Sequence, residues 1–159
     1  MESAYEALKG SKLGPELSDE QLDVLGCLVA FRDLAAGEVL VAEGTSDNHL
    51  YVVLQGALGV VRNAGKPEAV TLFTLTVGDF IGELSFIDAT PHYASVVALG
   101  PARVLGLERE KLESLLDSHP QAVYRVMRAI VRTTHQIQRR LSMQSIELAN
   151  YIYKQHGRY

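Results

Sequence analysis

The sequence has few of the features that mark several well-known classes of protein. It holds one cysteine, Cys27, and no tryptophan, so the chain by itself offers neither a disulfide nor a paired-thiol redox site. No uninterrupted apolar run reaches the roughly eighteen residues that a membrane-spanning helix needs. The first residues are acidic and lead into no apolar segment, which predicts a cytoplasmic protein without a secretory signal.

Catalytic and metal-binding patterns are also missing from the sequence. The serines stand in no Gly-x-Ser-x-Gly context, and there is no glycine-rich phosphate loop of the Walker or dinucleotide-binding type. Five histidines are scattered without the spacing of metal ligands, namely His49, His92, His119, His135 and His156. The sequence therefore predicts a protein that is not an enzyme and that carries neither a metal nor a cofactor.

What is present is enough for a well-packed domain. Hydrophobic residues make up 47% of the chain and charged residues 21%, a balance typical of a folded globular protein. Cys27 stands among Leu25, Leu28 and Val29, so we expect it to be a buried core thiol.

Charge is divided unevenly along the chain. Residues 1–119 carry 8 Lys and Arg against 18 Asp and Glu, whereas residues 120–159 carry 7 against 1. A basic segment of this kind indicates either nucleic-acid binding or a helix whose arginines are solvated or lean on an acidic body. The acidic remainder would repel DNA, which favours the second interpretation.

Short segments rich in Val, Leu, Tyr and Thr, bounded by Gly, Pro, Asn or Asp, dominate the middle of the chain. They are residues 31–34, 38–42, 49–55, 57–63, 70–76, 95–99 and 103–108. This spacing predicts a mainly β fold with flanking helices, as a β-sandwich, jelly-roll barrel or double-stranded β-helix. The expected helices are residues 4–9, residues 18–29 behind a capping box of Ser18 and Gln21, and residues 110–118. We expect the roll and its helices to occupy residues 1–119.

A long helix followed by a tail is predicted for residues 120–159, with the helix beginning at Pro120 and its dimerising part at residues 120–148. Mostly apolar residues recur along this helix at alternating spacings of four and three, which is the period of a coiled-coil seam. The stripe consists of Val123, Met127, Ile130, Thr134, Ile137, Leu141, Gln144 and Leu148. Either this helix packs on its own barrel, or it pairs with the same helix of a second chain. The regular alternation favours a parallel homodimer with Val123, Met127, Ile130, Ile137 and Leu141 at the interface.

The stretch 78–98 holds the best candidate for a binding site. Gly82 allows the backbone to approach a ligand closely because it lacks a Cβ atom. Residues 83–87 have the length of a short helix, whose first N–H groups have no partner within the helix and attract anions. Glu83 would then grip hydroxyl groups, or it would cap its own helix; both roles are compatible. The stretch therefore predicts a cradle for a sugar phosphate between two strands.

Gly82-Glu83-Leu84, followed by Pro91-x-x-Ala94 and a strand, resembles the phosphate-binding cassette of the cyclic-nucleotide-binding domain family, which includes the catabolite activator proteins. The glycines of Gly37-Glu38, Glu43-Gly44 and Gly78-Asp79 also stand in the order of that family's corners, so the resemblance extends over residues 17–141. It implies the jelly roll, with a C-terminal helix that forms a dimer and covers the nucleotide base.

The resemblance implies a set of ligand-binding residues: Gly82, Glu83, Leu84, His92, Tyr93, Ala94, Thr133 and Thr134. Glu83 would contact the ribose, the Ala94 backbone the phosphate, and Thr133 and Thr134 the purine, with Arg132 and His135 beside them. In the family an Arg and a Ser or Thr bind the cyclic phosphate, but His92 and Tyr93 occupy those positions here. Three alternatives follow: a pocket for cyclic AMP or another cyclic nucleotide, a pocket for another small molecule, or an empty pocket.

Catabolite activators continue beyond the dimer helix into a DNA-reading helix-turn-helix, for which residues 149–159 are too few. No specific DNA binding is therefore expected. The leading hypothesis is a stand-alone sensor module for signal transduction that passes ligand occupancy to an unknown protein partner through its dimer helix. The alternatives are an adaptor that has lost its ligand and, less favoured, a DNA-associated accessory protein that uses the basic helix.

Overall fold

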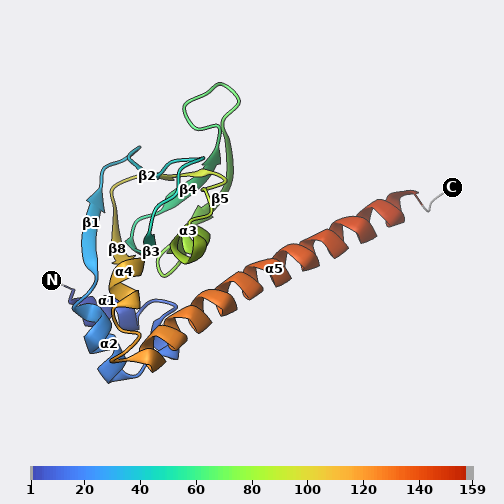
Figure 1. The fold of residues 1–159 in the computed structure, drawn as a ribbon. Coiled ribbons are helices and arrows are strands. Elements are labelled where there is room, and N and C mark those ends of the chain that lie inside the picture. The colour runs from blue at the N-terminus through green and yellow to red at the C-terminus, as the bar shows by residue number, and fades with distance from the viewer. Residues whose placement is uncertain (1, 157–159) are drawn as a thin grey trace.

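Two four-stranded antiparallel sheets form the body of the molecule. A computed structural model describes residues 2–156, apart from the side chain of His156 (Figure 1). The strand orders are β1-β8-β3-β6 and β2-β7-β4-β5. The strands are β1 (Ala30–Leu34), β2 (Val39–Val41), β3 (His49–Gln55), β4 (Leu58–Arg62), β5 (Val70–Leu75), β6 (Phe80–Ile81), β7 (Ser95–Ala98) and β8 (Ala102–Glu108). The predicted mainly β roll is confirmed; β6, with two residues, is too short to show a period and was not predicted.

The core is divided into two hydrophobic clusters. One lies between the sheets and includes Val53 of β3, Leu58 of β4 and Val104 of β8. The other joins the outer side of the first sheet to the helices and includes Leu25 and Ile130. The second cluster fixes the helices to the roll, because burying such side chains is the main favourable contribution to folding.

Short helices flank the roll at its N-terminal end. They are α1 (Ala4–Lys9), the single-turn η1 (Gly14–Glu16) and α2 (Asp19–Gly26). The capping box is confirmed: Ser18 Oγ accepts from the N–H of Gln21, and the Gln21 side chain accepts from the N–H of Ser18. The prediction for Cys27 is wrong, because its side chain is exposed. Leu25 takes the inward position, and Cys27, two residues later, falls on the opposite side.

Helix α5 (Pro120–His156) begins where the sequence predicts and continues beyond the roll (Figure 1). Before it, α4 (Arg109–Glu113) is shorter than the predicted segment 110–118. Residues 149–156 extend α5, and residues 157–159 lie outside the described part of the chain. None of the described helices combines the length and the apolar character needed to cross a membrane.

The seam residues of α5 fall into two groups. Val123 and Met127 are half-buried against the helix-side core, and Ile130 is only 1% exposed. Ile130 therefore offers almost no surface to a partner, which corrects its assignment to a dimer interface. Packing on the chain's own roll, the alternative left open by the sequence, holds for this half of the helix. Ile137, Leu141 and Leu148 are exposed, so the dimer prediction rests on the second half.

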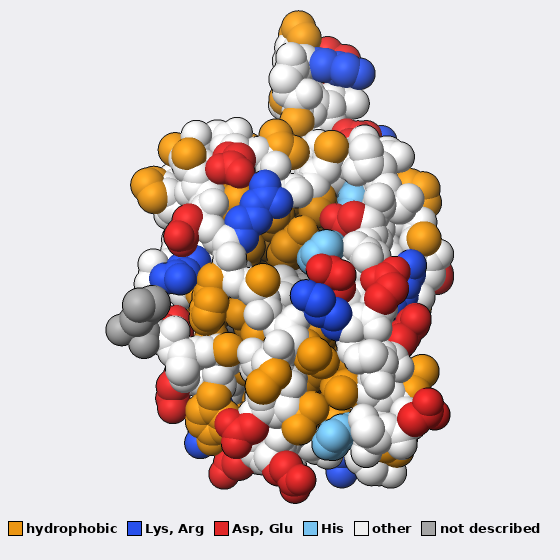
Figure 2. Space-filling view, turned by 60° about the vertical axis from the view of Figure 1, so that its left-hand side comes forward, with side chains coloured by type: hydrophobic (Ala, Val, Ile, Leu, Met, Phe, Trp, Pro, Cys, Tyr) orange, Lys and Arg blue, Asp and Glu red, His pale blue; other side chains and the backbone are white. Residues whose placement is uncertain are grey.

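Charges are interspersed on the face that carries β1 and the N-terminal helices. Figure 2 shows acidic and basic side chains alternating there with hydrophobic ones, without a continuous basic surface. Three arginines in the first half of α5 form ion pairs with one carboxylate, that of Glu16. The distances from Arg125, Arg128 and Arg132 are 4.0, 3.3 and 2.7 Å. The side chain of Glu16 is only 7% exposed. Part of the basic helix is therefore paired with an acidic residue of the rest of the chain, in agreement with the second interpretation of its charge.

Candidate functional site

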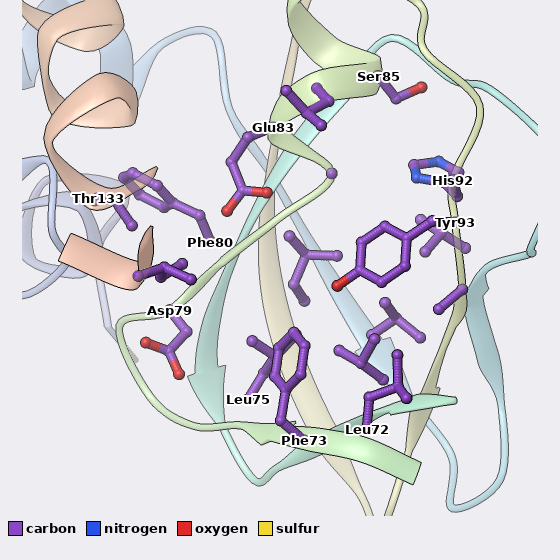
Figure 3. Close-up of a pocket in the computed structure, with 18 of the residues that line it drawn as sticks. Leu72, Phe73, Leu75, Asp79, Phe80, Glu83, Ser85, His92, Tyr93 and Thr133 are labelled. Carbon is purple, nitrogen blue, oxygen red and sulfur yellow. The ribbon is translucent and has the colours of Figure 1, made fainter. Parts of the chain in front are cut away.

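A cavity of about 560 Å³ lies between the roll and α5 (Figure 3). Its walls come from β2, β4, β5 and β7, from β6 and the start of α3 (Glu83–Asp88), and from one face of α5. All but one of the predicted ligand-binding residues line it, namely Gly82, Glu83, Leu84, His92, Tyr93, Ala94 and Thr133. The cassette and the long helix, about fifty residues apart in sequence, thus share one cavity.

Gly82 makes the connection between β6 and α3 possible. Its φ of 82° is left-handed, and a Cβ atom there would lie 3.0 Å from the carbonyl oxygen of His49. Other residues would be strained in this conformation. The chain therefore turns directly from a strand into the short helix, which places Glu83 at the cavity wall.

Ser85 fixes α3 to the loop that precedes β3. Its buried hydroxyl donates to the carbonyl of Asp47 at 2.8 Å and accepts from the N–H of Asp47 at 2.7 Å. A buried polar group with both roles satisfied resists displacement. Helix α3, which carries Glu83, is therefore attached through Ser85 to the loop before β3.

Glu83 is a carboxyl group in a mainly apolar environment. Burial raises the pKa of Glu83 above its ordinary value, its own backbone N–H and Lys12 oppose the rise, and Asp79 adds to it. Lys12 is engaged with Asp79, since their Nζ and Oδ1 atoms lie 2.9 Å apart. Burial alone would also raise the pKa of Asp79, but the N–H of Thr76 and the Lys12 ammonium hold it below its ordinary value. Glu83 is thus the acid of this wall that is most readily protonated.

His92 does not replace an arginine directed at a ligand. Its side chain is 8% exposed, and Nε2 lies 3.6 Å from Oδ2 of Asp47 without a hydrogen bond. The N–H of His92 donates to the carbonyl of Thr45 at 2.8 Å, which holds the backbone against the neighbouring loop. The imidazole therefore faces Asp47, and Figure 3 shows it away from the centre of the cavity.

Tyr93 occupies part of the space that a ligand would use. Its ring reaches into the cavity with the hydroxyl foremost, opposite Leu72 and Phe73 (Figure 3). Burial raises the pKa of Tyr93 above its ordinary value, and the nearby Glu83 adds to the rise. The side chain is still half-exposed, so the cavity remains open around it.

Helix α5 contributes a different set of residues from the one expected. Thr133 is buried and lines the cavity, whereas Thr134 does not: it is exposed, and its hydroxyl donates to the carbonyl of Ile130 at 3.0 Å. One helical step turns the side chain by about 100°, which moves Thr134 off the cavity face. Arg132 is directed to Glu16, and His135 also lies outside the cavity.

Several lining residues were not predicted from the sequence. Leu72 and Phe73 are neighbours on β5 and both line the cavity, next to a β-bulge opposite Val60 and Val61. Arg140 on α5 also lines it. The helical period could have found Arg140, since it lies seven residues after Thr133 and so on the same face. Among the described residues, no cluster of His, Cys, Asp and Glu could hold a metal ion.

Comparison with known proteins places this geometry in a family. The family described as the cyclic nucleotide-binding domain matches residues 31–119, which include the roll, the cassette and most of the cavity wall. The chain belongs to the cyclic nucleotide-binding domain family. Within this family, the departures at His92 and Tyr93 fall in the cassette itself.

Solved structures of other proteins share the fold of this chain. A cyclic nucleotide-binding domain from Methylobacillus flagellatus superposes with a TM-score of 0.75 at 25% identity, over 92% of this chain and 82% of that one. The N-terminal domain of a transcriptional regulator from Streptomyces coelicolor gives 0.71 at 28% identity, over 85% of this chain and 94% of that one.

Curated relatives in the family are longer proteins. The CRP-like cAMP-activated global transcriptional regulator of Mycobacterium tuberculosis is 26% identical over 63% of this chain, which spans 45% of that regulator. The chain thus spans less than half the length of this relative. What the similarity supports is the domain and a regulatory or sensor role.

Proposed function

We propose that this domain binds a small molecule in the cavity between the roll and α5 and passes its occupancy to α5. The observation that carries the proposal is that Glu83 of the cassette and Thr133 of α5 line the same cavity. A ligand that touches both elements has a different affinity for different positions of the helix. Such differential affinity is what allows a ligand to shift a conformational equilibrium. The domain would act by binding and not by catalysis.

The division of α5 into two halves supports this mechanism. The first half is fixed by Ile130 in the core and by the three arginines at Glu16. The second half is exposed, and its residues Ile137, Arg140 and Leu141 line the cavity across from the roll. A ligand can therefore move the second half without breaking the core.

Cyclic nucleotides are the first ligands to test. The Mycobacterium relative is named as cAMP-activated, and Glu83 stands where the family's cassette contacts a ribose. We expect weaker contacts to the phosphate group of such a ligand, since His92 faces Asp47 and the Tyr93 ring occupies part of the cavity. Charge-assisted bonds from an arginine contribute about 1.5–3 kcal/mol each, so we expect cyclic AMP to bind at least ten- to a hundredfold more weakly than with an intact cassette.

A parallel homodimer is the proposed form in which α5 transmits the signal. The exposed part of the seam, Ile137, Leu141 and Leu148, gives a partner helix its apolar contacts. We propose a cytoplasmic domain with an unidentified protein partner. Direct reading of DNA by residues 2–156 is not part of the proposal, because the arginines at the start of α5 are paired with Glu16.

Calorimetric titration tests the proposal. Cyclic AMP and cyclic GMP would be titrated at about pH 6 and about pH 7.5, on either side of the ordinary pKa of histidine. Saturable heat and a raised melting temperature support ligand binding. Growth of the heat at the lower pH would show that protonation of the protein favours binding of the nucleotide.

A second candidate function is an adaptor without a ligand. The projection of the Tyr93 ring into the cavity favours it. For an adaptor, neither nucleotide produces heat or a change in melting temperature, while a dimer still forms. A Tyr93→Ser variant that remains silent in the same titration would add to that conclusion, because the space would then be open.

A further inference from the structure

The cavity is unusually rich in exposed apolar side chains. Six large residues from β5, α3, the loop before β7 and α5 are each 45–59% exposed, and all of them line it. They are Leu72, Phe73, Leu84, Tyr93, Ile137 and Leu141. Exposed apolar side chains that converge in one concave site are typical of a ligand pocket, and the volume is within the range of drug-sized ligands. An apolar or aromatic ligand body would cover this surface.

Among the described residues, the charges around the cavity leave one cation without a partner. Lys12 and Arg140 are the permanently cationic side chains that line it, and Lys12 is paired with Asp79 at 2.9 Å. His92 faces Asp47. Arg140, exposed on α5, has no hydrogen bond or ion pair with any other residue of the described part of the chain. An acidic group in the cavity would therefore find its unpaired partner on the helix and not on the cassette.

We propose that the cavity takes an amphipathic anion, with an apolar or aromatic body against Leu72, Phe73 and Tyr93 and an acidic group on the guanidinium of Arg140. This inference rests on the proposed function and names the ligand chemistry of the same site. A cyclic phosphate and an organic carboxylate share that chemistry. In either case the phosphate-binding arginine, absent at position 92, is replaced from a different element.

The location of Arg140 has a consequence for signalling. The first half of α5 is fixed in the helix-side core, whereas Arg140 lies in the exposed second half and lines the cavity. A bond between the ligand's acidic group and Arg140 therefore acts directly on the movable segment. Ligands of equal size that lack the acidic group would bind without drawing the helix inward.

Two fluorescent probes with similar bodies test the charge requirement. Anilinonaphthalene sulfonate has an aromatic body with an anionic group, and phenylnaphthylamine has the same body without it. The full chain should bind the sulfonate with one saturable site per chain and about tenfold or more tightly than the neutral amine, as expected for one charge-assisted contact.

Three variants locate that site. Arg140→Gln should weaken the sulfonate about tenfold and leave the amine unchanged. Arg139→Gln is the matched control, because Arg139 is the neighbouring exposed arginine and does not line the cavity. Phe73→Ala should weaken both probes, which would place them in the cavity and not on the exposed end of α5. Circular dichroism of each variant confirms that it is folded.

Displacement then identifies the source of the anion. Release of the sulfonate by cyclic AMP would indicate a cyclic phosphate, and release by decanoate a carboxylate; either supports the proposal. Equal affinity of the two probes, or equal behaviour of Arg140→Gln and Arg139→Gln, would overturn the inference but leave the proposed function standing. If neither probe nor any nucleotide binds saturably, the proposed function fails as well.

Discussion

At the scale of single residues, the cavity is controlled by side chains that differ from what the family's cassette leads one to expect. Glu83 keeps the position of the ribose acid but is surrounded by apolar groups, so burial raises its pKa. His92 is turned to Asp47, and Tyr93 takes up space in the cavity (Figure 3). We expect His92 and Tyr93 to weaken the binding of a phosphate group, and burial makes Glu83 easier to protonate.

Glu83→Gln should stabilise the domain near neutral pH. The folded-state pKa of Glu83 lies above the unfolded value, so its favourable contribution is complete below the unfolded pKa and is lost as pH rises through the folded one. The variant should therefore melt at a higher temperature than the wild type at about pH 7.5, and the difference should vanish at about pH 4. Thermal unfolding of both proteins across that range measures it. A constant difference at all pH values would contradict the assignment.

Restoring the cassette should restore phosphate binding. In the double variant His92→Arg and Tyr93→Ser, the guanidinium supplies charge-assisted bonds and the smaller serine frees space. We expect cyclic AMP to bind about ten- to a hundredfold more tightly than to the wild type. Titration calorimetry compares the two proteins, with Tyr93→Ser alone as the control for the space effect. No gain over that control would show that the backbone no longer presents a phosphate site.

At the scale of elements, α5 combines a fixed half and an exposed half. Ile130 is in the core, and the nearly buried carboxylate of Glu16 gathers three arginines of the helix. An acid with so little exposure requires such partners, because an unpaired buried charge is costly. Glu16 therefore ties the first half of α5 to η1.

Glu16→Gln should destabilise the domain and loosen this anchor. The three guanidiniums are themselves more than a third exposed, so solvent screening limits the loss to about 1–2 kcal/mol in the free energy of unfolding. Urea unfolding measures the loss. Glu68→Gln, in the exposed hairpin between β4 and β5, is the matched control and should change stability by less than about 0.5 kcal/mol. Equal stability of the two variants would show that the anchor lies elsewhere.

The elements themselves could largely be predicted from the sequence, for identifiable reasons. Val- and Leu-rich segments between turn residues marked seven of the eight strands, and the capping box located α2. Two details were missed for different reasons. The part of β5 that lines the cavity, which includes Leu72 and Phe73, depends on a tertiary arrangement that no local period encodes. The exposure of Cys27 follows from the helical period, because Cys27 lies two residues after the inward Leu25.

At the scale of the whole molecule, the sequence predicted the part of the site that belongs to the family's motif and missed most of the part that α5 contributes. The cavity residues Gly82 to Leu84, His92 to Ala94 and Thr133 were all predicted from the family resemblance. Arg140 and Ile137 became part of the site because α5 runs past the cavity, a tertiary arrangement that the heptad pattern does not specify. The same pattern, shared by core packing and by dimer seams, explains why Ile130 was misassigned.

Leu148→Glu should convert a dimer into a monomer. Leu148 is exposed, lies on the seam beyond the roll and does not line the cavity, so a buried carboxylate would disrupt the interface without disturbing the site. Sedimentation velocity at micromolar concentration measures the mass of the wild type and the variant. Met143→Glu is the control, because Met143 is also an exposed apolar residue of α5 but lies off the seam. This variant should remain dimeric. A monomeric wild type would remove the dimer from the account.

The central claim, that the cassette and α5 share one ligand site, is tested most directly by amide hydrogen exchange. Exchange would be followed with and without saturating anilinonaphthalene sulfonate, and again with cyclic AMP. The account predicts slower exchange in α3 and in residues 133–144 of α5 together, with residues 120–130 little changed because the core already protects them. Protection of α3 without α5, or of the distal end of α5 alone, would contradict it.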